Sequence, residues 1–348
     1  MQQMAQKYIK DGYTVSIILE SRICVFRHND YIGDSVHNQT IAKYIDFNIY
    51  ENVFFLKLPK TQANNWYKLE AVRSEYYQKV LEDNEFNEVL IWNGNFQYQQ
   101  LFLTLLKKQN QLKKNFIEVA WFDQNNSVYI DPNGVNGASL LAKTPPPELT
   151  EKEISHVKAF IEGYTKGHPL KVKGKREKLK ILIPLQVDTD SNIIKHSPFK
   201  DMKEFICFLE DWIPKDNVEV TLRAHPKAVY DYEIKSNRTD FIVNRAGCIK
   251  NKIAESDLII GINSTVLLQS LPFYKHVIAF GDGVYNASSP IVKMDFNDTF
   301  QLHDIDIYEY QKLIHFLVFG NQIQLKVPKI NTQLKYVHQR LCLLFNRI

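Results

Sequence analysis

Apolar runs alternate with amphipathic stretches along most of the chain. Short apolar runs are typical of buried strands, whereas longer stretches with apolar residues three and four positions apart are typical of helices. In the first third, strands are expected at 13–19, 52–58, 88–93 and 116–122, and helices at 1–11, 65–83 and 96–112. This alternation predicts a mainly parallel sheet with helices on both faces.

The second half repeats the alternation more clearly. Strands are expected at 181–185, 218–224, 239–244, 257–262 and 276–281, and helices at 201–213, 248–255 and 265–274. This is the pattern of an open, doubly wound α/β domain, whose ligands bind at the carboxyl ends of the strands. Two Rossmann-like domains of this kind, facing a central cleft, would form a sugar-nucleotide transferase architecture.

A change of composition separates the two halves. Turn residues gather at 131–137, and the Pro-rich segment 144–150 ends in a helix-capping pattern. We therefore expect an N-terminal Rossmann-like domain over 1–150 and a C-terminal one over 151–348, whose final helices can cross back to the first domain. The basic stretch 171–180 is expected to be a solvated loop, with binding of an acidic lipid head group as the alternative.

Composition narrows the class of protein. The 348 residues are 45% hydrophobic, and 43 basic residues nearly balance 39 acidic ones. These values argue against a mainly disordered chain and against a nucleic-acid partner. The four cysteines lack the spacing of a zinc site, and no apolar run approaches the roughly 20 residues that span a bilayer. We expect a soluble, cytoplasmic protein, at most peripheral on a membrane.

The segment GINSTV at 261–266 is a candidate phosphate site. It follows an apolar strand and opens a helix, so its backbone N–H groups and the hydroxyls of Ser264 and Thr265 could hold a phosphate. A helix cap formed by Asn263 or Ser264, without a ligand, explains the same pattern equally well. No Gly-rich dinucleotide motif or phosphate loop occurs, which disfavours nicotinamide chemistry and ATP hydrolysis.

Two further groups of polar residues follow strands of the second half. Arg223 and His225 end the strand at 218–224, where they could neutralise a phosphate and contact a nucleotide. Gln186, Asp188 and Asp190 follow the strand at 181–185, and a carboxylate there could act as a nucleophile or a general base. The alternatives are a structural histidine and a plain turn. A metal site on the two aspartates is the weaker hypothesis, and we expect no metal.

In the first half of the chain, Glu118 is the candidate functional residue, because its carboxylate interrupts an apolar strand. A buried carboxylate is costly unless it is paired or functional. We expect either an acid or base at the cleft between the domains, or a buried ion pair or exposed edge position.

Together these segments resemble the bacterial capsular polysaccharide synthesis family that contains the retaining β-Kdo glycosyltransferases. Kdo is an eight-carbon acidic sugar that is carried by CMP. The resemblance covers most of the chain and rests on the order of several motifs. They are IWNG (91–94), IEVAW (117–121), DPNGVN (131–136), PLQVDTDSNI (184–193), HSPF (196–199), RAHP (223–226), GINSTV (261–266) and FGDGVYN (280–286).

The resemblance implies a GT-B-like α/β fold and a metal-free transfer of Kdo from CMP-β-Kdo, with no cofactor besides this donor substrate. It selects Asp190 as the nucleophile, because the family's acid follows the glutamine by four residues. Gln186 would orient the sugar and Glu118 would be the acid/base. The set implied to meet the CMP moiety is Arg223, His225, Asn263, Ser264 and Thr265.

The resemblance also implies partners and a location. The acceptor would be lipid-linked or a saccharide, and the reaction would build a capsule linker in the cytoplasm, peripherally at the inner membrane, in contact with capsule assembly proteins. Two alternatives stay open. The chain could be a nucleotide-binding scaffold without catalysis, or a UDP-sugar transferase or epimerase on the same architecture.

Overall fold

The computed structural model describes 13–18, 23–28, 53–56, residues 74, 77, 78, 81 and 82, and then 88–107, 112–168, 178–226 and 238–325. For 13–18, 23–28, 53–56 and 97–98 only the backbone is described. The expected helix at 1–11, most of the basic stretch at 171–180 and the residues after 325 lie outside the described residues.

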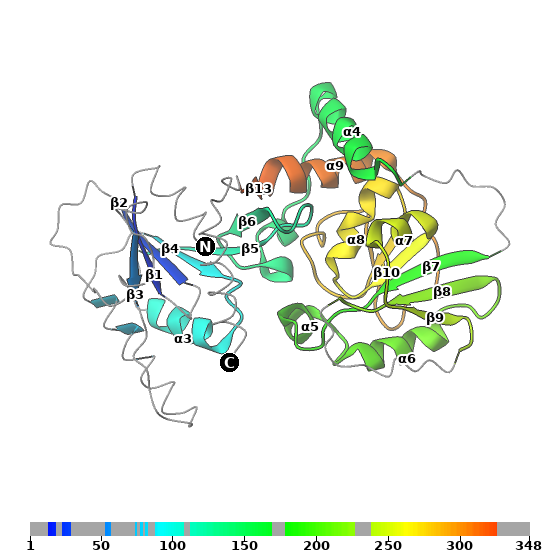
Figure 1. The fold of residues 1–348 in the computed structure, drawn as a ribbon, viewed down its shortest axis with the longest axis horizontal. Coiled ribbons are helices and arrows are strands. Elements are labelled where there is room, and N and C mark those ends of the chain that lie inside the picture. The colour runs from blue at the N-terminus through cyan, green and yellow to red at the C-terminus, as the bar shows by residue number, and fades with distance from the viewer. Residues whose placement is uncertain are drawn as a thin grey trace. The chain divides into compact units, whose positions relative to one another are not determined.

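The chain divides into two units (Figure 1). The first comprises 1–135 and 323–348, and the second comprises 136–322. The sequence placed the boundary at residue 150, whereas residues 136–150 group with the second unit. The helix Ile307–His315 also belongs to the second unit, and the described residues that return to the first unit are 323–325.

The first unit contains a seven-stranded sheet in the order β13-β6-β5-β4-β2-β1-β3. Its strands are β1 (Tyr13–Ile18), β2 (Ile23–His28), β3 (Val53–Leu56), β4 (Glu88–Trp92), β5 (Lys113–Val119), β6 (Ser127–Asp131) and β13 (Ile323–Gln324). Among the described strands of this sheet, only the pairs β1–β3 and β4–β5 are parallel. The expectation of a mainly parallel sheet was wrong here, because the segments before β2 and β6 are only four and seven residues long, too short for the crossover that parallel neighbours need.

Helix α3 (Gln97–Leu106) packs on this first sheet. Val89 and Ile91 of β4 are two positions apart, so their side chains point to the same face of the sheet, where they pack with Phe102 and Leu106 of the helix. Residues 74, 77, 78, 81 and 82 are helical, in agreement with the helix expected at 65–83. The ring of Tyr77 lies edge-on to that of Phe102, with centroids 5.1 Å apart.

The second unit contains a six-stranded sheet in the order β12-β11-β10-β7-β8-β9, in which all paired strands are parallel. Its strands are β7 (Leu179–Pro184), β8 (Val218–Arg223), β9 (Phe241–Asn244), β10 (Leu258–Gly261), β11 (His276–Ala279) and β12 (Val292–Lys293). The doubly wound pattern expected for the second half is thereby confirmed.

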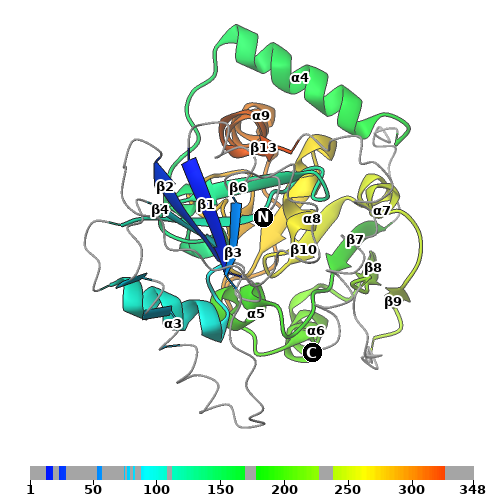
Figure 2. The same ribbon diagram turned by 60° about the vertical axis from the view of Figure 1, so that its left-hand side comes forward.

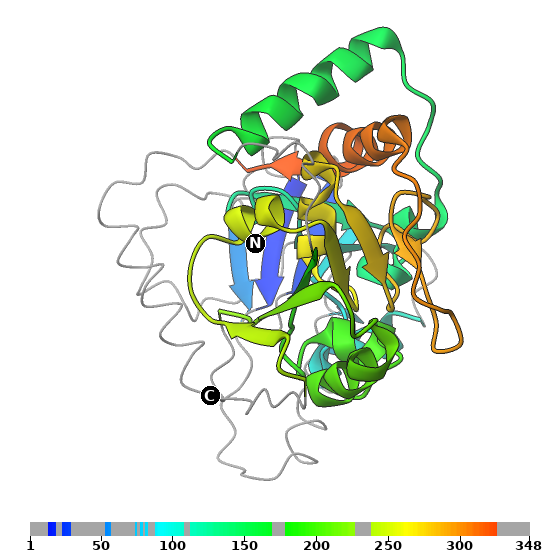
Figure 3. The ribbon, with the colours of Figure 1, turned by 90° about the vertical axis from the view of Figure 1, so that its right-hand side faces the viewer.

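Helices cover both faces of this second sheet (Figure 3). Its helices are α4 (Glu151–Thr165), α5 (Ser191–His196), α6 (Met202–Trp212), α7 (Ile249–Glu255), α8 (Thr265–Gln269) and α9 (Ile307–His315). Ile181 and Ile183 of β7 face α5 and α6, and share a core with Phe205 and Leu209 of α6. On the other face, α7 contacts β7, and α8 contacts β10 and β11.

Helix α4 begins at a complete capping box and packs on α9 (Figure 2). Thr150 accepts a hydrogen bond from the Glu153 amide, and the Glu153 carboxylate accepts one from the Thr150 amide at 2.8 Å. This is the cap that the Thr-x-x-Glu spacing predicts. The Tyr308 hydroxyl of α9 donates to Glu148, just before the helix.

Candidate functional site

The functional candidates of the second unit lie at one edge of its sheet. Strands β7, β8, β10 and β11 are parallel in register, so their carboxyl ends reach the same edge. The motifs 184–193, 223–226, 261–266 and 280–286 follow these four strand ends. The sheet therefore brings together segments that are up to about a hundred residues apart, at the edge where doubly wound folds bind ligands.

Gln186 and Asn263 form a reciprocal pair at this edge. The Gln186 Nε2 donates to Asn263 Oδ1 at 2.9 Å, and the Asn263 backbone N–H donates to Gln186 Oε1 at 3.2 Å. Gln186 is buried and Asn263 is half-buried. Because β7 and β10 are neighbours, the pair fixes the chain just beyond two adjacent strands.

Asn263 also holds helix α5. Its Nδ2 donates to the Asn192 carbonyl at 3.0 Å and to the His196 carbonyl at 3.2 Å. The His196 carbonyl accepts a further hydrogen bond from the Asp282 amide at 2.9 Å. Both ends of this six-residue helix are therefore tied to turns that follow β10 and β11.

Asp190 is the N-cap of α5. Its Oδ1 accepts from the Asn192 amide at 2.8 Å, and its side chain is exposed. Asp188, two residues earlier, turns to another helix and accepts from the Met202 amide at 2.8 Å. The two carboxylates therefore accept hydrogen bonds from the backbone of different helices, Asp190 from α5 and Asp188 from α6. Of the two, Asp190 is the one whose carboxylate faces solvent.

Ser264 and Thr265 begin helix α8. Ser264 is the N-cap, and its hydroxyl accepts from the Val266 amide at 3.3 Å; Thr265 is the first helical residue. Both are half-buried. The cap that the sequence offered as the ligand-free alternative is therefore present, and it leaves the expected phosphate contact a prediction.

Arg223 is a buried residue at the end of β8. Its guanidinium donates to Asn244 Oδ1 at 2.6 Å and to the carbonyls of Ala246 and Gly247 at 2.7 and 2.8 Å. The planar fork of donors on an arginine suits these contacts, which hold the last residue of β9 and two residues of the loop after it. His225 follows it, half-buried, beyond the strand end. The observed contacts give Arg223 a structural role, and its contact with CMP stays a prediction.

The turn at 280–286 packs tightly against α5 and the end of β10. Tyr285 is fully buried, and its hydroxyl shares its one hydrogen between the carbonyls of Gly281 and Ile262, at 3.0 and 3.2 Å. Burial raises the pKa of the Tyr285 hydroxyl, so it remains a neutral donor. A Cβ on Gly281 would lie 2.6 Å from the His196 carbonyl oxygen, which explains why glycine stands there.

His196 and Asp282 meet beside this turn. Burial lowers the pKa of His196, an effect that the Asp282 carboxylate opposes and Lys195 increases. Burial raises the pKa of Asp282, but its interactions with Lys293, Asn286 and His196 together hold this pKa below its usual value. Gly137 packs against both residues, because a Cβ there would lie 2.8 Å from His196 Nδ1 and 2.6 Å from Asp282 Cβ.

Glu118 of the first unit is half-buried near the carboxyl end of β5. Its Oε2 accepts from Asn93 Nδ2 at 2.5 Å, and its Oε1 accepts from the Val119 amide at 2.9 Å. Asn93 and Gly94 follow β4 with φ of +61° and +84°. The motifs 91–94 and 117–121 therefore join through side chains at adjacent parallel strands. These contacts partner the carboxylate but do not test its role as an acid or base.

Comparison with known proteins decides the family. The model of the family described as "Capsule polysaccharide biosynthesis protein" matches residues 106–289, which is more than half of the chain. The chain belongs to this family. The resemblance inferred from the ordered motifs is confirmed, since the match contains most of them.

One curated relative of this family member is Protein FixF of Sinorhizobium fredii (strain NBRC 101917 / NGR234). It is 24% identical over 250 residues, which cover 66% of this chain and 58% of that protein. The chain therefore spans less than two thirds of the relative's length.

Two solved structures are similar to this capsule family member. One is Thermosulfurimonas dismutans KpsC, beta Kdo 2,7 transferase, with a TM-score of 0.50 and 15% identity over 75% of this chain and 94% of that one. The other is the beta Kdo 2,4 transferase of the same KpsC, with a TM-score of 0.46 and 13% identity over 64% and 77%. The first likeness confirms the expected GT-B-like α/β fold.

Some residues of the site carried no role in the sequence analysis. Asn192, His196, Gly281 and Asp282 belong to motifs that supported the resemblance, but their patterns name no chemistry. The buried atoms Asn192 Oδ1 and His196 Nε2 have no hydrogen-bond partner among the described residues. The signal that could have found them is the glycine at 281, because a small residue after a buried strand indicates close approach of another segment.

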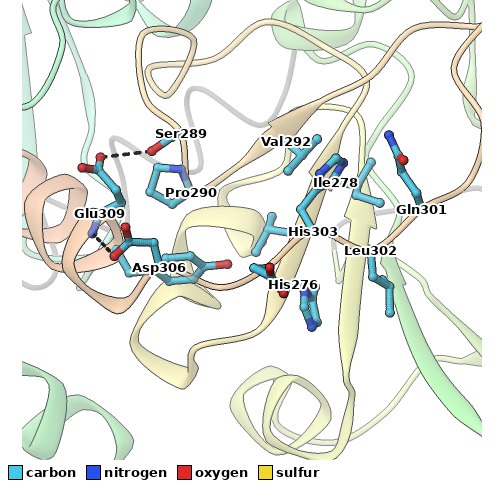
Figure 4. A pocket seen from close by; sticks show the side chains of 13 residues that line it. His276, Ile278, Ser289, Pro290, Val292, Gln301, Leu302, His303, Asp306 and Glu309 are labelled. Carbon is cyan, nitrogen blue, oxygen red and sulfur yellow. Dashed lines mark hydrogen bonds between the residues drawn. The ribbon is translucent and has the colours of Figure 1, made fainter.

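A cavity of about 240 Å³ lies at a different place in the second unit (Figure 4). Its lining includes His276, the first residue of β11, together with His303, Asp304, Asp306 and Glu309. Asp306 caps α9, and Ser289 donates to Glu309 at 3.0 Å. Since three carboxylates and no lysine or arginine line it, the cavity does not suit a sugar nucleotide.

The described residues contain neither a metal-binding cluster nor a membrane-spanning helix. Within 88–107, 112–168, 178–226 and 238–325, no group of three or more His, Cys, Asp or Glu side chains is arranged to hold a metal ion. None of the helices in the described part of the chain combines the length and the apolar character that crossing a membrane requires.

Proposed function

We propose that the chain is a retaining glycosyltransferase of capsule synthesis that moves Kdo from CMP-β-Kdo to a lipid-linked or saccharide acceptor. Family membership supports a role in capsule polysaccharide biosynthesis. The observation that carries the finer proposal is the placement of Asp190. Its exposed carboxylate stands beyond β7 at the carboxyl edge of the parallel sheet, on a helix tied to the turns after β10 and β11.

In the proposed first step, an oxygen of the Asp190 carboxylate attacks the anomeric carbon of Kdo. The bond from that carbon to the CMP phosphate oxygen breaks, and CMP leaves with the electron pair. In the second step, an acceptor hydroxyl attacks the same carbon, Asp190 is released as a carboxylate, and the hydroxyl proton passes to a base, for which Glu118 is the candidate. Two inversions give net retention.

Protein groups supply the charge stabilisation that the leaving CMP needs in this proposal. Thr265, Ser264 and the N-terminus of α8 follow β10, and His225 follows β8 at the same edge. Donors held in place before the reaction stabilise developing negative charge without reorganisation. The proposal therefore needs no metal.

Intact-mass analysis after incubation with CMP-Kdo tests this reaction. The expected result is a covalent addition of one Kdo residue that maps to Asp190, with release of CMP. Asp190→Asn removes the nucleophile and leaves α5 capped, because asparagine is as good an N-cap as aspartate. Asp201→Asn is the matched control, since Asp201 caps α6 in the same way and lies outside the proposed reaction.

The outcomes separate the candidate functions. Loss of CMP release in Asp190→Asn but not in Asp201→Asn supports the transferase. CMP binding without turnover, unchanged by Asp190→Asn, would instead support the scaffold without catalysis. Stronger thermal stabilisation by UDP than by CMP would support the UDP-sugar alternative, since a bound ligand raises apparent stability.

A further inference from the structure

Asn263 uses all of its N–H groups within the protein. The backbone N–H donates to Gln186 Oε1, and the side-chain Nδ2 donates to the carbonyls of Asn192 and His196. An asparagine has one backbone and two side-chain N–H groups, so these three bonds engage every donor. A phosphate accepts hydrogen bonds and requires donors. In the observed arrangement, Asn263 therefore has no N–H left to donate to the phosphate of CMP-Kdo.

Helix α5 depends on these contacts for its position. It has six residues, and a helix of this length is unstable without tertiary contacts. Ile193 is the buried residue that anchors it in the core. The carbonyls of Asn192 and His196 accept hydrogen bonds from the Asn263 side chain, and the His196 carbonyl accepts another from the Asp282 amide.

We propose that Asn263, oriented by Gln186, is a positioning residue that sets helix α5 and with it the carboxylate of Asp190. The inference rests on the proposed function and deepens it. The Gln186 side chain donates to Asn263 Oδ1 and accepts from its backbone N–H, which fixes the plane of the carboxamide. That plane directs both Nδ2 hydrogens to α5. A shift of about 1 Å in a reacting group can cost about 100-fold in rate.

Asn263→Asp tests the proposal. Aspartate keeps the size of the side chain and its acceptor for Gln186, but it replaces the two donors to α5 with an oxygen that faces two carbonyl oxygens. We expect kcat for CMP release to fall about 100-fold while KM for CMP-Kdo changes less than about threefold. Hydrogen exchange at the amides of Ile193 and Ile194, which bond to the Asp190 carbonyl, should become faster.

Asn297→Asp is the matched control, because it makes the same chemical change at an exposed loop residue of the same unit. Gln186→Glu is the second variant. Glutamate still accepts from the Asn263 backbone N–H but can no longer donate to Asn263 Oδ1. The fall in kcat and the faster exchange at Ile193 and Ile194 should therefore appear in weaker form. Thermal unfolding of each variant shows whether the fold is intact.

Several results would overturn the proposal. A rise in KM with unchanged kcat in Asn263→Asp would show that Asn263 binds the substrate CMP-Kdo directly. Unchanged exchange at Ile193 and Ile194 would show that Asn263 does not set α5. If both variants unfold, slower exchange of the Asn263 side-chain amide when CMP is added to wild-type protein would also contradict it.

The proposed function can fail separately. If wild-type protein neither releases CMP from CMP-Kdo nor forms the adduct, the reaction is wrong. The exchange experiment still decides whether Asn263 positions α5.

Discussion

The close contact between Gly281 and helix α5 makes Gly281→Ala a sharp test of the described packing. A Cβ at this position would lie 2.6 Å from the His196 carbonyl oxygen, 2.7 Å from Ile262 Cγ2 and 3.0 Å from Asn263 Nδ2. The carbonyl is backbone and cannot rotate away. The substitution must therefore displace either α5 or the turn at 280–286.

The expected cost has two parts. Overpacking of a tight interior costs about 1–3 kcal/mol. Displacement of the His196 carbonyl also weakens its hydrogen bonds from Asn263 and Asp282, which adds about 1 kcal/mol. A total of about 2–4 kcal/mol corresponds to a fall in Tm of roughly 4–16 °C for a unit of this size.

Gly163→Ala is the matched control, measured in the same thermal and urea unfolding assays. Gly163 lies within α4, and a Cβ there would meet nothing within 4 Å. Alanine should stabilise that helix by about 0.5–1 kcal/mol. If Gly281→Ala melts at or above the wild-type temperature, the tight contact between the 281 turn and α5 is refuted.

Three further changes have defined outcomes. Thr150→Ala removes the α4 cap and should lower the free energy of unfolding by about 1 kcal/mol in urea titration, whereas Thr150→Ser should retain most of it. Because burial lowers the pKa of His196 below 6.5, the unfolded chain binds the proton more readily, so stability present above pH 6.5 should be lost as the pH falls below it. His196→Asn should flatten this slope in unfolding measured between pH 5 and 7; an unchanged slope would assign the pH dependence to other groups. Arg223→Lys keeps the charge but loses the fork, so hydrogen exchange at 244–247 should become faster, and unchanged exchange would show that the three contacts do not hold the loop.

Most strands could be predicted from the sequence, because buried parallel strands form continuous apolar runs. The expected strand at 218–224 is β8 at 218–223, and the one at 276–281 is β11 at 276–279. β2 was missed because Arg27 and His28 end an otherwise apolar run, so the hairpin partner of β1 does not stand out. α5 was missed because Asp-Thr-Asp-Ser-Asn has the composition of a turn and also that of a helix cap.

The sequence predicted which segments of the site come together, but not what their side chains do. Gln186 and Asn263 were expected at the same edge, and they are in contact. Their mutual pairing, and the bonds from Asn263 to α5, depend on side-chain directions that spacing does not specify. Arg223 illustrates the same limit, because its position at a strand end was predicted and its attachment to the loop at 244–247 was not.

The division of the chain has a consequence for synthesis. The second unit is one uninterrupted stretch, 136–322, whereas the first is assembled from segments on either side of it. Strand β13 pairs with β6, so the sheet of the first unit acquires this edge strand only after the whole second unit has left the ribosome. The unit encoded first is thus completed last. A premature stop at codon 323 would remove this edge strand and leave every residue of the other unit in place.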